Sequence, residues 1–175
     1  EKFYEMRKEK VHLRKNLNAF SEDVAILLGS IEAERPGMII DASSSVQGIF
    51  KIAREMLVGQ KVEALLPRFV AKKHEGFIKK YSQNSRHDLN QQWNTYARTI
   101  DGSIFQADVR LKIYPYINRG LNLISQVRRV QNPEIILVVD SQGMIVDCSE
   151  ELFAVLGLTK RDLDTVNILE ICPGF

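Results

Sequence analysis

The three histidines are the residues of this sequence best suited to chemistry, because imidazole can move a proton or bind a metal near neutral pH. Only His74 falls on an apolar stripe, where Val70, Phe77, Ile78 and Tyr81 share its face of a predicted helix. A neutral ring facing an apolar pocket suits a haem iron. A core histidine would instead bond a backbone carbonyl through one ring nitrogen. Both interpretations place His74 on the buried side of its helix.

No arrangement of side chains typical of an enzyme accompanies His74. His12 lies on a leading helix and His87 in a polar loop, so neither pairs with a buried Ser or Cys. The ten glycines are scattered and form no phosphate-binding loop. Two pairs of acids, at 22–23 and 150–151, are adjacent in sequence, so their side chains diverge on a helix or a strand. The sequence therefore predicts a protein that is not an enzyme.

Cys148 and Cys172 have no nearby His or Cys that would complete a metal cluster. Both are predicted to be reduced core thiols, which favours a cytoplasmic setting, and no metal is expected unless His74 binds haem. The longest apolar runs, such as Ile135–Val139, are far shorter than the roughly 20 residues of a membrane helix. No membrane insertion is therefore predicted for this segment, which could be the cytosolic part of a larger membrane or cytoskeletal protein.

The net charge of +2 is unevenly distributed along the chain. From residue 131 onward, eight acids and two bases give −6, so the first 130 residues carry +8. The bases cluster at 7–15 and 68–80, which is typical of solvated helix faces and would also favour an acidic partner or phosphates. Trp93 and Tyr96 do not alternate with bases on one strand face, so no nucleic-acid partner is expected.

The segment Gly37–Asp41 recurs 106 residues later as Gly143–Asp147. The register then continues without a gap over 33 positions, with apolar classes aligned and a shared Pro-x-Phe ending at Pro67 and Pro173. Two copies of one domain type explain this pattern. Because the second copy has only about 42 residues, we expect further residues or a partner chain to complete it.

The first copy is predicted to contain two strands, a helical excursion and three further strands. The expected strands are 24–28, 38–41, 90–100, 103–113 and 120–127, with short helices after residue 46 and a longer one opened by Pro67. Phe105 and Val109 alternate with polar residues, which indicates a half-buried strand. This order predicts an α+β fold, namely a five-stranded antiparallel sheet with helices on one face.

Residues 2–20 are predicted to form an amphipathic helix with the apolar stripe Phe3, Met6, Leu13, Leu17 and Phe20. Each large side chain left in water forfeits roughly 1.5–3 kcal/mol. The stripe must therefore be covered by its own sheet, by a second copy of the chain or by another protein. We expect this helix and the sheet face to bind a protein partner or to form a homodimer. The predicted domains are 1–22, 23–130 and 134–175.

Several segments jointly resemble the PAS family: 37–43, 49–59, 62–67, 74–81 and 101–105. The resemblance covers residues 23–130 and, in truncated form, 134–175, and its style is similar to PAS modules in large membrane proteins of ciliated protists. It implies a non-catalytic sensory or protein-interaction module in signal transduction. Its sheet and helices would enclose a ligand pocket, and its flanking helices would mediate dimerisation.

The PAS resemblance implies a pocket lined by His74, Ile78, Tyr81, Trp93, Phe105, Val109 and Leu123. Oxygen-sensing bacterial PAS domains bind haem through a histidine in a setting similar to that of His74. Trp93, however, stands where they carry a ligand-sensing arginine. The reactive cysteine of flavin-binding relatives would fall near 56–65, which contains none. No cofactor is therefore expected. The alternatives are a haem or small-ligand sensor using His74, and an architectural subunit of a large complex.

Overall fold

Five strands with alternating apolar and polar residues form one antiparallel sheet in the computed structural model, which describes residues 21–83, 92–116, 120–131 and 134–174. The strands are β1 (Val24–Ser30), β2 (Ile39–Ala42), β3 (Gln92–Arg98), β4 (Ile104–Tyr116) and β5 (Gly120–Arg129). They lie in the order β2-β1-β5-β4-β3, and every neighbouring pair is antiparallel. The predicted five-stranded α+β fold is confirmed.

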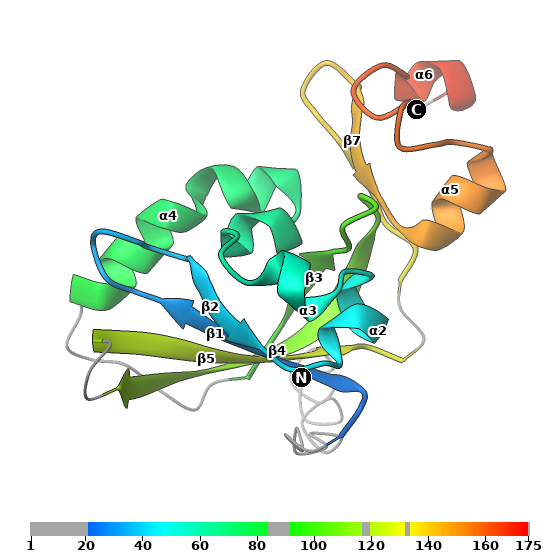
Figure 1. Ribbon diagram of the computed structural model, residues 1–175. Helices are drawn as coiled ribbons and strands as arrows, with labels where there is room; N and C mark the ends of the chain where they lie inside the picture. The colour runs from blue at the N-terminus through cyan, green and yellow to red at the C-terminus, as the bar shows by residue number, and fades with distance from the viewer. Residues whose placement is uncertain (1–20, 84–91, 117–119, 132–133, 175) are drawn as a thin grey trace, which may run out of the picture.

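The helices of the first domain cover one face of this sheet (Figure 1). They are α2 (Val46–Phe50), α3 (Arg54–Leu57), the 3₁₀ helix η1 (Val62–Leu65) and α4 (Arg68–Gln83). The helix α4 begins directly after Pro67, as predicted, because proline cannot continue a preceding helix but is compatible with the start of one. Phe50, Leu57 and Leu65 are buried between these helices and the sheet, and they belong to one continuous core with Phe105 and Val127.

The predicted leading helix at 1–22, with its stripe Phe3, Met6, Leu13, Leu17 and Phe20, lies outside the described residues. Among the helices that the structure does describe, none has both the length and the apolar character needed to cross a bilayer.

The repeated segment of the sequence has the same backbone frame in both places. Residues 134–174 form β6 (Leu137–Val139), β7 (Ile145–Cys148), α5 (Glu150–Leu156) and α6 (Ile168–Ile171), and β6 pairs with β7 antiparallel. Three backbone contacts of the first copy recur in the second copy after a shift of 106 residues. The hydrogen bond from Ile39 N to Gln60 O matches the one from Ile145 N to Val166 O, and the bond from Val62 N to Gly37 O matches the one from Ile168 N to Gly143 O. The bridge between Met38 and Lys61 likewise matches the bridge between Met144 and Asn167. This second unit contacts the first through a parallel bridge between Ile104 and Ser149.

Candidate functional site

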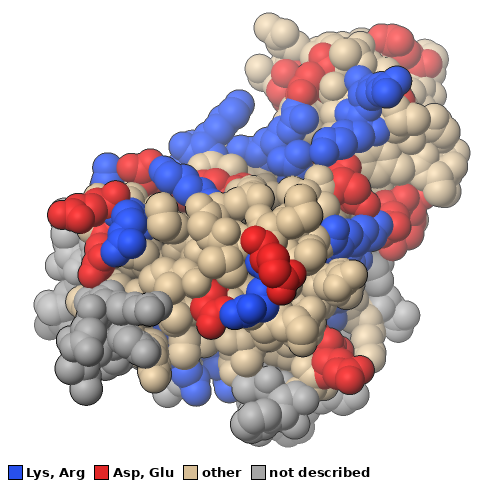
Figure 2. Space-filling view, viewed as in Figure 1, with Lys and Arg blue, Asp and Glu red and all other residues tan. Residues whose placement is uncertain are grey.

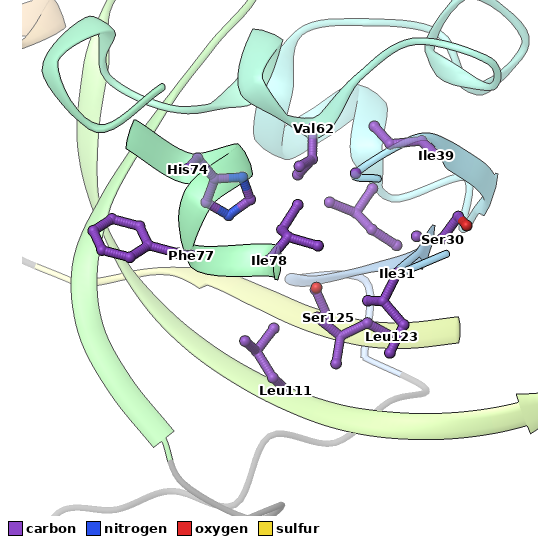
Figure 3. Close-up of a pocket in the computed structure, with 13 residues that line it drawn as sticks. Ser30, Ile31, Ile39, Val62, His74, Phe77, Ile78, Leu111, Leu123 and Ser125 are labelled. Atoms are coloured by element: carbon purple, nitrogen blue, oxygen red, sulfur yellow. The ribbon is translucent and has the colours of Figure 1, made fainter. Parts of the chain in front are cut away.

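A cavity of about 160 Å³ lies between α4 and the sheet. Its wall is mostly apolar, and Figure 3 shows His74 and Ile78 projecting from α4 toward Val62 and the strands. The residues that line it are Leu27, Gly29, Ser30, Ile31, Gly37, Ile39, Val62, His74, Phe77, Ile78, Leu111, Leu123 and Ser125. An engineered protein cavity of ~150 Å³ is large enough to hold benzene. The cavity therefore has room for a molecule of about one ring.

Gly37 brings the loop between β1 and β2 into the wall of this cavity. Its φ of +74° lies in the left-handed region, which glycine adopts without strain. A Cβ at this position would lie 3.0 Å from Cδ1 of Ile78 and 3.3 Å from the carboxylate oxygens of Glu63. The missing side chain thus lets the loop, the helix α4 and η1 meet at one point.

His74 is held at the edge of the cavity by a carboxylate. Its Nδ1 lies 3.0 Å from Oε1 of Glu63, which stands on η1. The partner of this nitrogen is therefore a carboxylate and not the backbone carbonyl expected of a core histidine. The second oxygen of Glu63, Oε2, is buried and has no hydrogen-bond partner among the described residues. The pair fixes the orientation of the ring, which lines the cavity.

The structure brings together only part of the predicted pocket. His74, Ile78 and Leu123 line the cavity. Phe105 lies in the core, where its ring centroid is 5.7 Å from that of Phe50, and Val109 packs against the same core.

Two predicted pocket residues have other positions. Trp93 is 36% exposed on β3, the strand at one edge of the sheet, and it does not line the cavity. Tyr81 belongs to α4, but its side chain lies outside the described residues.

Sequence reasoning missed the wall contributed by Ser30, Ile31 and Gly37. A signal was present in the sequence, because the first copy has a longer connection at 31–36 than the second copy, and this connection ends in Pro-Gly. An insertion next to a strand end is a frequent place for binding residues. The pocket that the PAS resemblance implied was placed on α4 and the strands, and neither that resemblance nor the periodicity of single elements shows which loop faces which helix.

The two cysteines differ in their surroundings. Cys148 is buried, and burial raises the pKa of its thiol to about 12. Cys172 is exposed, so the prediction of two core thiols was wrong for this residue. Within the described parts of the chain, no group of three or more His, Cys, Asp or Glu residues is arranged to hold a metal ion.

The fold agrees with comparisons against known proteins. A family model described as a PAS domain matches residues 24–127, which is more than half of the chain, and the protein therefore belongs to the PAS domain family. PAS domains are sensory or interaction modules of signalling proteins. No curated protein sequence matches the chain.

Solved structures of PAS domains share this fold at low sequence identity. The PAS domain of a Desulfitobacterium hafniense protein has a TM-score of 0.51 and 13% identity, and the match covers 65% of this chain and 100% of that one. A PAS domain from Colwellia psychrerythraea has a TM-score of 0.50 and 14% identity, with 71% and 97% covered. At such identities the likeness shows the fold alone.

Proposed function

We propose that residues 24–127 form a non-catalytic sensory module that binds a small, mostly apolar molecule beneath α4. The observation that carries this proposal is the cavity of about 160 Å³ between that helix and the sheet. Ligand sites of this kind combine an apolar wall with a few polar groups that orient the ligand. Here the polar groups are His74 and the serines Ser30 and Ser125. The matching ligand is a single-ring molecule with one hydrogen-bonding group.

A haem is the less suitable occupant. The hydrogen bond from His74 to Glu63 resembles the carboxylate partner that iron-binding histidines commonly have. However, sites for drug-sized ligands occupy ≈ 300–1,000 Å³, and a haem is no smaller than such ligands. The cavity of about 160 Å³ between α4 and the sheet is smaller than this range, which favours a smaller occupant. A Soret band that appears on haem reconstitution and is lost in His74→Ala would overturn this assignment.

Titration with benzene and with phenol, followed by the chemical shifts of methyl groups around the cavity, tests the ligand site. We expect saturable shifts at Ile78 and Leu123, and tighter binding of phenol because its hydroxyl can reach the polar groups. Ser125→Ile fills the cavity from β5 and should abolish the shifts. Lys112→Ile serves as the matched control, because Lys112 is exposed and lies outside the cavity wall. Unsaturable shifts in the wild type, or equal binding in both variants, would contradict the proposal.

We also propose that residues 134–174 begin a second PAS-type domain. The support is the backbone frame around β7, which coincides with that around β2 after a shift of 106 residues. Hydrogen exchange tests this proposal, since the hydrogen-bonded amides of Ile145 and Ile168 should be protected to a degree similar to those of Ile39 and Val62. Exchange of the two second-copy amides at the rate of an unfolded chain would exclude a folded second unit.

A further inference from the structure

A buried carboxylate of the second unit lies between the two layers of the first domain. Asp147 on β7 is fully buried, with 0% of its surface exposed. Its Oδ2 accepts the backbone N–H of Arg68, the first residue of α4, at 2.9 Å. Its Oδ1 lies 3.9 Å from Nε of Arg98, the last residue of β3. Asp147 thus lies between the start of a helix that covers the cavity and the end of a strand of the sheet.

The contact between Asp147 and Arg98 is close to forming but incomplete. Oδ1 of Asp147 and Nε of Arg98 are both buried, and neither has a hydrogen-bond partner among the residues that the structure describes. A charge-assisted N–H···O bond has a length of about 2.7–2.9 Å, so the gap of 3.9 Å closes with a movement of about 1 Å. Leaving buried charged groups without partners costs free energy. A small movement of Asp147 relative to Arg98 therefore has a large effect on the energy of this pair.

The helix α4 connects this contact with the ligand cavity. Arg68 stands at its start, and His74 and Ile78 line the cavity from further along the same helix. Ten residues separate Arg68 from Ile78, which is about 15 Å along a helix axis. Closely packed interiors transmit displacements of a rigid element. A ligand that moves α4 against the sheet therefore moves the Arg68 amide, with Asp147 attached, relative to Arg98.

Other contacts across the boundary hold the second unit in place. The side chain of Arg68 forms an ion pair with Asp164, and Nζ of Lys51 lies 2.7 Å from Glu150. Nζ of Lys160 donates to the carbonyl of Ile100 at 3.2 Å. In Figure 2, Lys and Arg side chains gather along the boundary below the Asp and Glu side chains of the upper lobe. The uneven charge of the sequence thus matches a basic domain against an acidic unit.

We propose that α4 couples the cavity to residues 134–174 through Asp147, so that ligand binding makes or breaks its pair with Arg98. This inference rests on the ligand site proposed above. Coupling between two sites is reciprocal. If the ligand changes the equilibrium constant for forming the Asp147–Arg98 pair by some factor, then forming that pair changes the affinity of the cavity for the ligand by the same factor.

The test uses the full chain of 175 residues, with benzene as the probe. Saturation with benzene should shift the Nε–H resonance of Arg98. Asp147→Ala removes the hydrogen bond to the Arg68 amide, while the Arg68–Asp164 ion pair remains, and it should change the benzene affinity by at least about fivefold, the lower end of typical coupling. Asp147→Asn keeps an oxygen for the Arg68 amide but loses the charge, so its effect should be smaller and in the same direction. If Asp147→Ala does not fold, Asp147→Asn carries the comparison.

Glu150→Ala is the matched control, because it breaks a contact across the same boundary that goes to Lys51 on the α2 side. Its benzene affinity should stay within about twofold of the wild type. Failure of the wild type to bind benzene would overturn the ligand site, and this inference with it. Benzene binding with an unmoved Arg98 resonance would overturn the coupling alone. Equal affinity changes in Asp147→Ala and Glu150→Ala would overturn the route through α4.

Discussion

The two copies of the repeated segment share a backbone frame but direct the same acid to different partners. Asp41 in the first copy accepts from Nη2 of Arg54 at 2.6 Å, so its ion pair stays within the first domain. The position that matches Arg54 in the second copy is Lys160. Lys160 instead donates to a carbonyl of the first domain, and Asp147 bonds the start of α4. A short motif thus determines the local hydrogen bonds, whereas its side chains can serve either the copy itself or its neighbour.

The copies differ further in how deeply matching apolar residues are buried. Ile49 is 5% exposed, whereas Val155, at the matching position, is 73% exposed. Ile49 belongs to a core closed by residues of β3, β4 and β5, which come from far along the chain. The described part of the second copy contributes two strands. Burial is therefore set by distant strands and not by the motif itself.

The largest expected contrast is between Ile49→Ala and Val155→Ala. The first substitution leaves a cavity in the core and should lower the free energy of unfolding by about 2–5 kcal/mol. The second alters an exposed side chain and should change it by no more than about 0.5 kcal/mol. Urea unfolding of the chain, followed by circular dichroism and by the fluorescence of the single Trp, Trp93, in the first domain, measures both variants. Similar losses in both variants would show that a packed surface covers Val155.

The glycine that opens each copy should respond alike in the two places. Gly37 has φ +74° and Gly143 has φ +81°. Alanine in the left-handed region costs about 1–2 kcal/mol. In Gly143→Ala, the new Cβ would also lie 3.0 Å from Oδ1 of Asn167, which caps α6. We therefore expect Gly37→Ala to destabilise the first domain, and Gly143→Ala to increase amide exchange in β7 and α6.

Gly76→Ala is the control for this prediction. Gly76 lies inside α4, and a Cβ there would meet nothing within 4 Å. The substitution should therefore stabilise the helix by up to about 1 kcal/mol. A gain in stability for Gly37→Ala, matching that of Gly76→Ala, would show that the turn before β2 does not need its left-handed residue.

Sequence reasoning predicted the features that depend on residues close together in the chain and missed those that depend on residues far apart. Alternation along one strand predicted 103–113, and the structure has β4 at Ile104–Tyr116. The apolar stripe placed His74 and Ile78 on the side of α4 that faces the cavity. Trp93 was placed by counting from a hairpin, and position along a strand does not show that the strand lies at an edge. The contact between Asp147 and Arg68 could not be predicted from the sequence, because 79 residues separate the two along the chain.

Asp147 and Asp101 should make the stability of the protein depend on pH in opposite directions. Burial raises the pKa of Asp147 above its ordinary value of 3.8, against the opposing effects of the Arg68 amide and Arg98. The folded state then binds more protons than the unfolded state, so stability falls as pH rises from 3.8 through the raised pKa. Asp147→Asn should remove this slope. Its persistence in Asp147→Asn, measured by unfolding between pH 3 and 8, would assign it to another group.

Asp101 provides the opposite case in the first domain. Burial would raise its pKa, but hydrogen bonds from Thr99, Lys51 and Ser103 outweigh burial and hold the pKa well below 3.8. Its contribution is present above pH 3.8 and is lost as the pH falls through the lowered pKa. Since this side chain is 45% exposed, we expect Asp101→Asn to cost below about 1 kcal/mol near neutral pH. A stability unaffected by Asp101→Asn at pH 7 would contradict the role of these bonds.

The smallest effect is expected for the pair of Lys51 and Glu150, although it joins the two regions directly. Nζ lies 2.7 Å from the Glu150 carboxylate, but the two side chains are 38% and 54% exposed. Exposed pairs contribute about 0.2–1 kcal/mol and are screened by salt. A double-mutant cycle with Lys51→Met and Glu150→Gln should therefore give a coupling below about 0.5 kcal/mol that fades in ~1 M salt. A larger coupling that persists in high salt would show that water does not reach the boundary between the two units. The pair of Lys51 and Glu150 would then couple the two units together with Asp147.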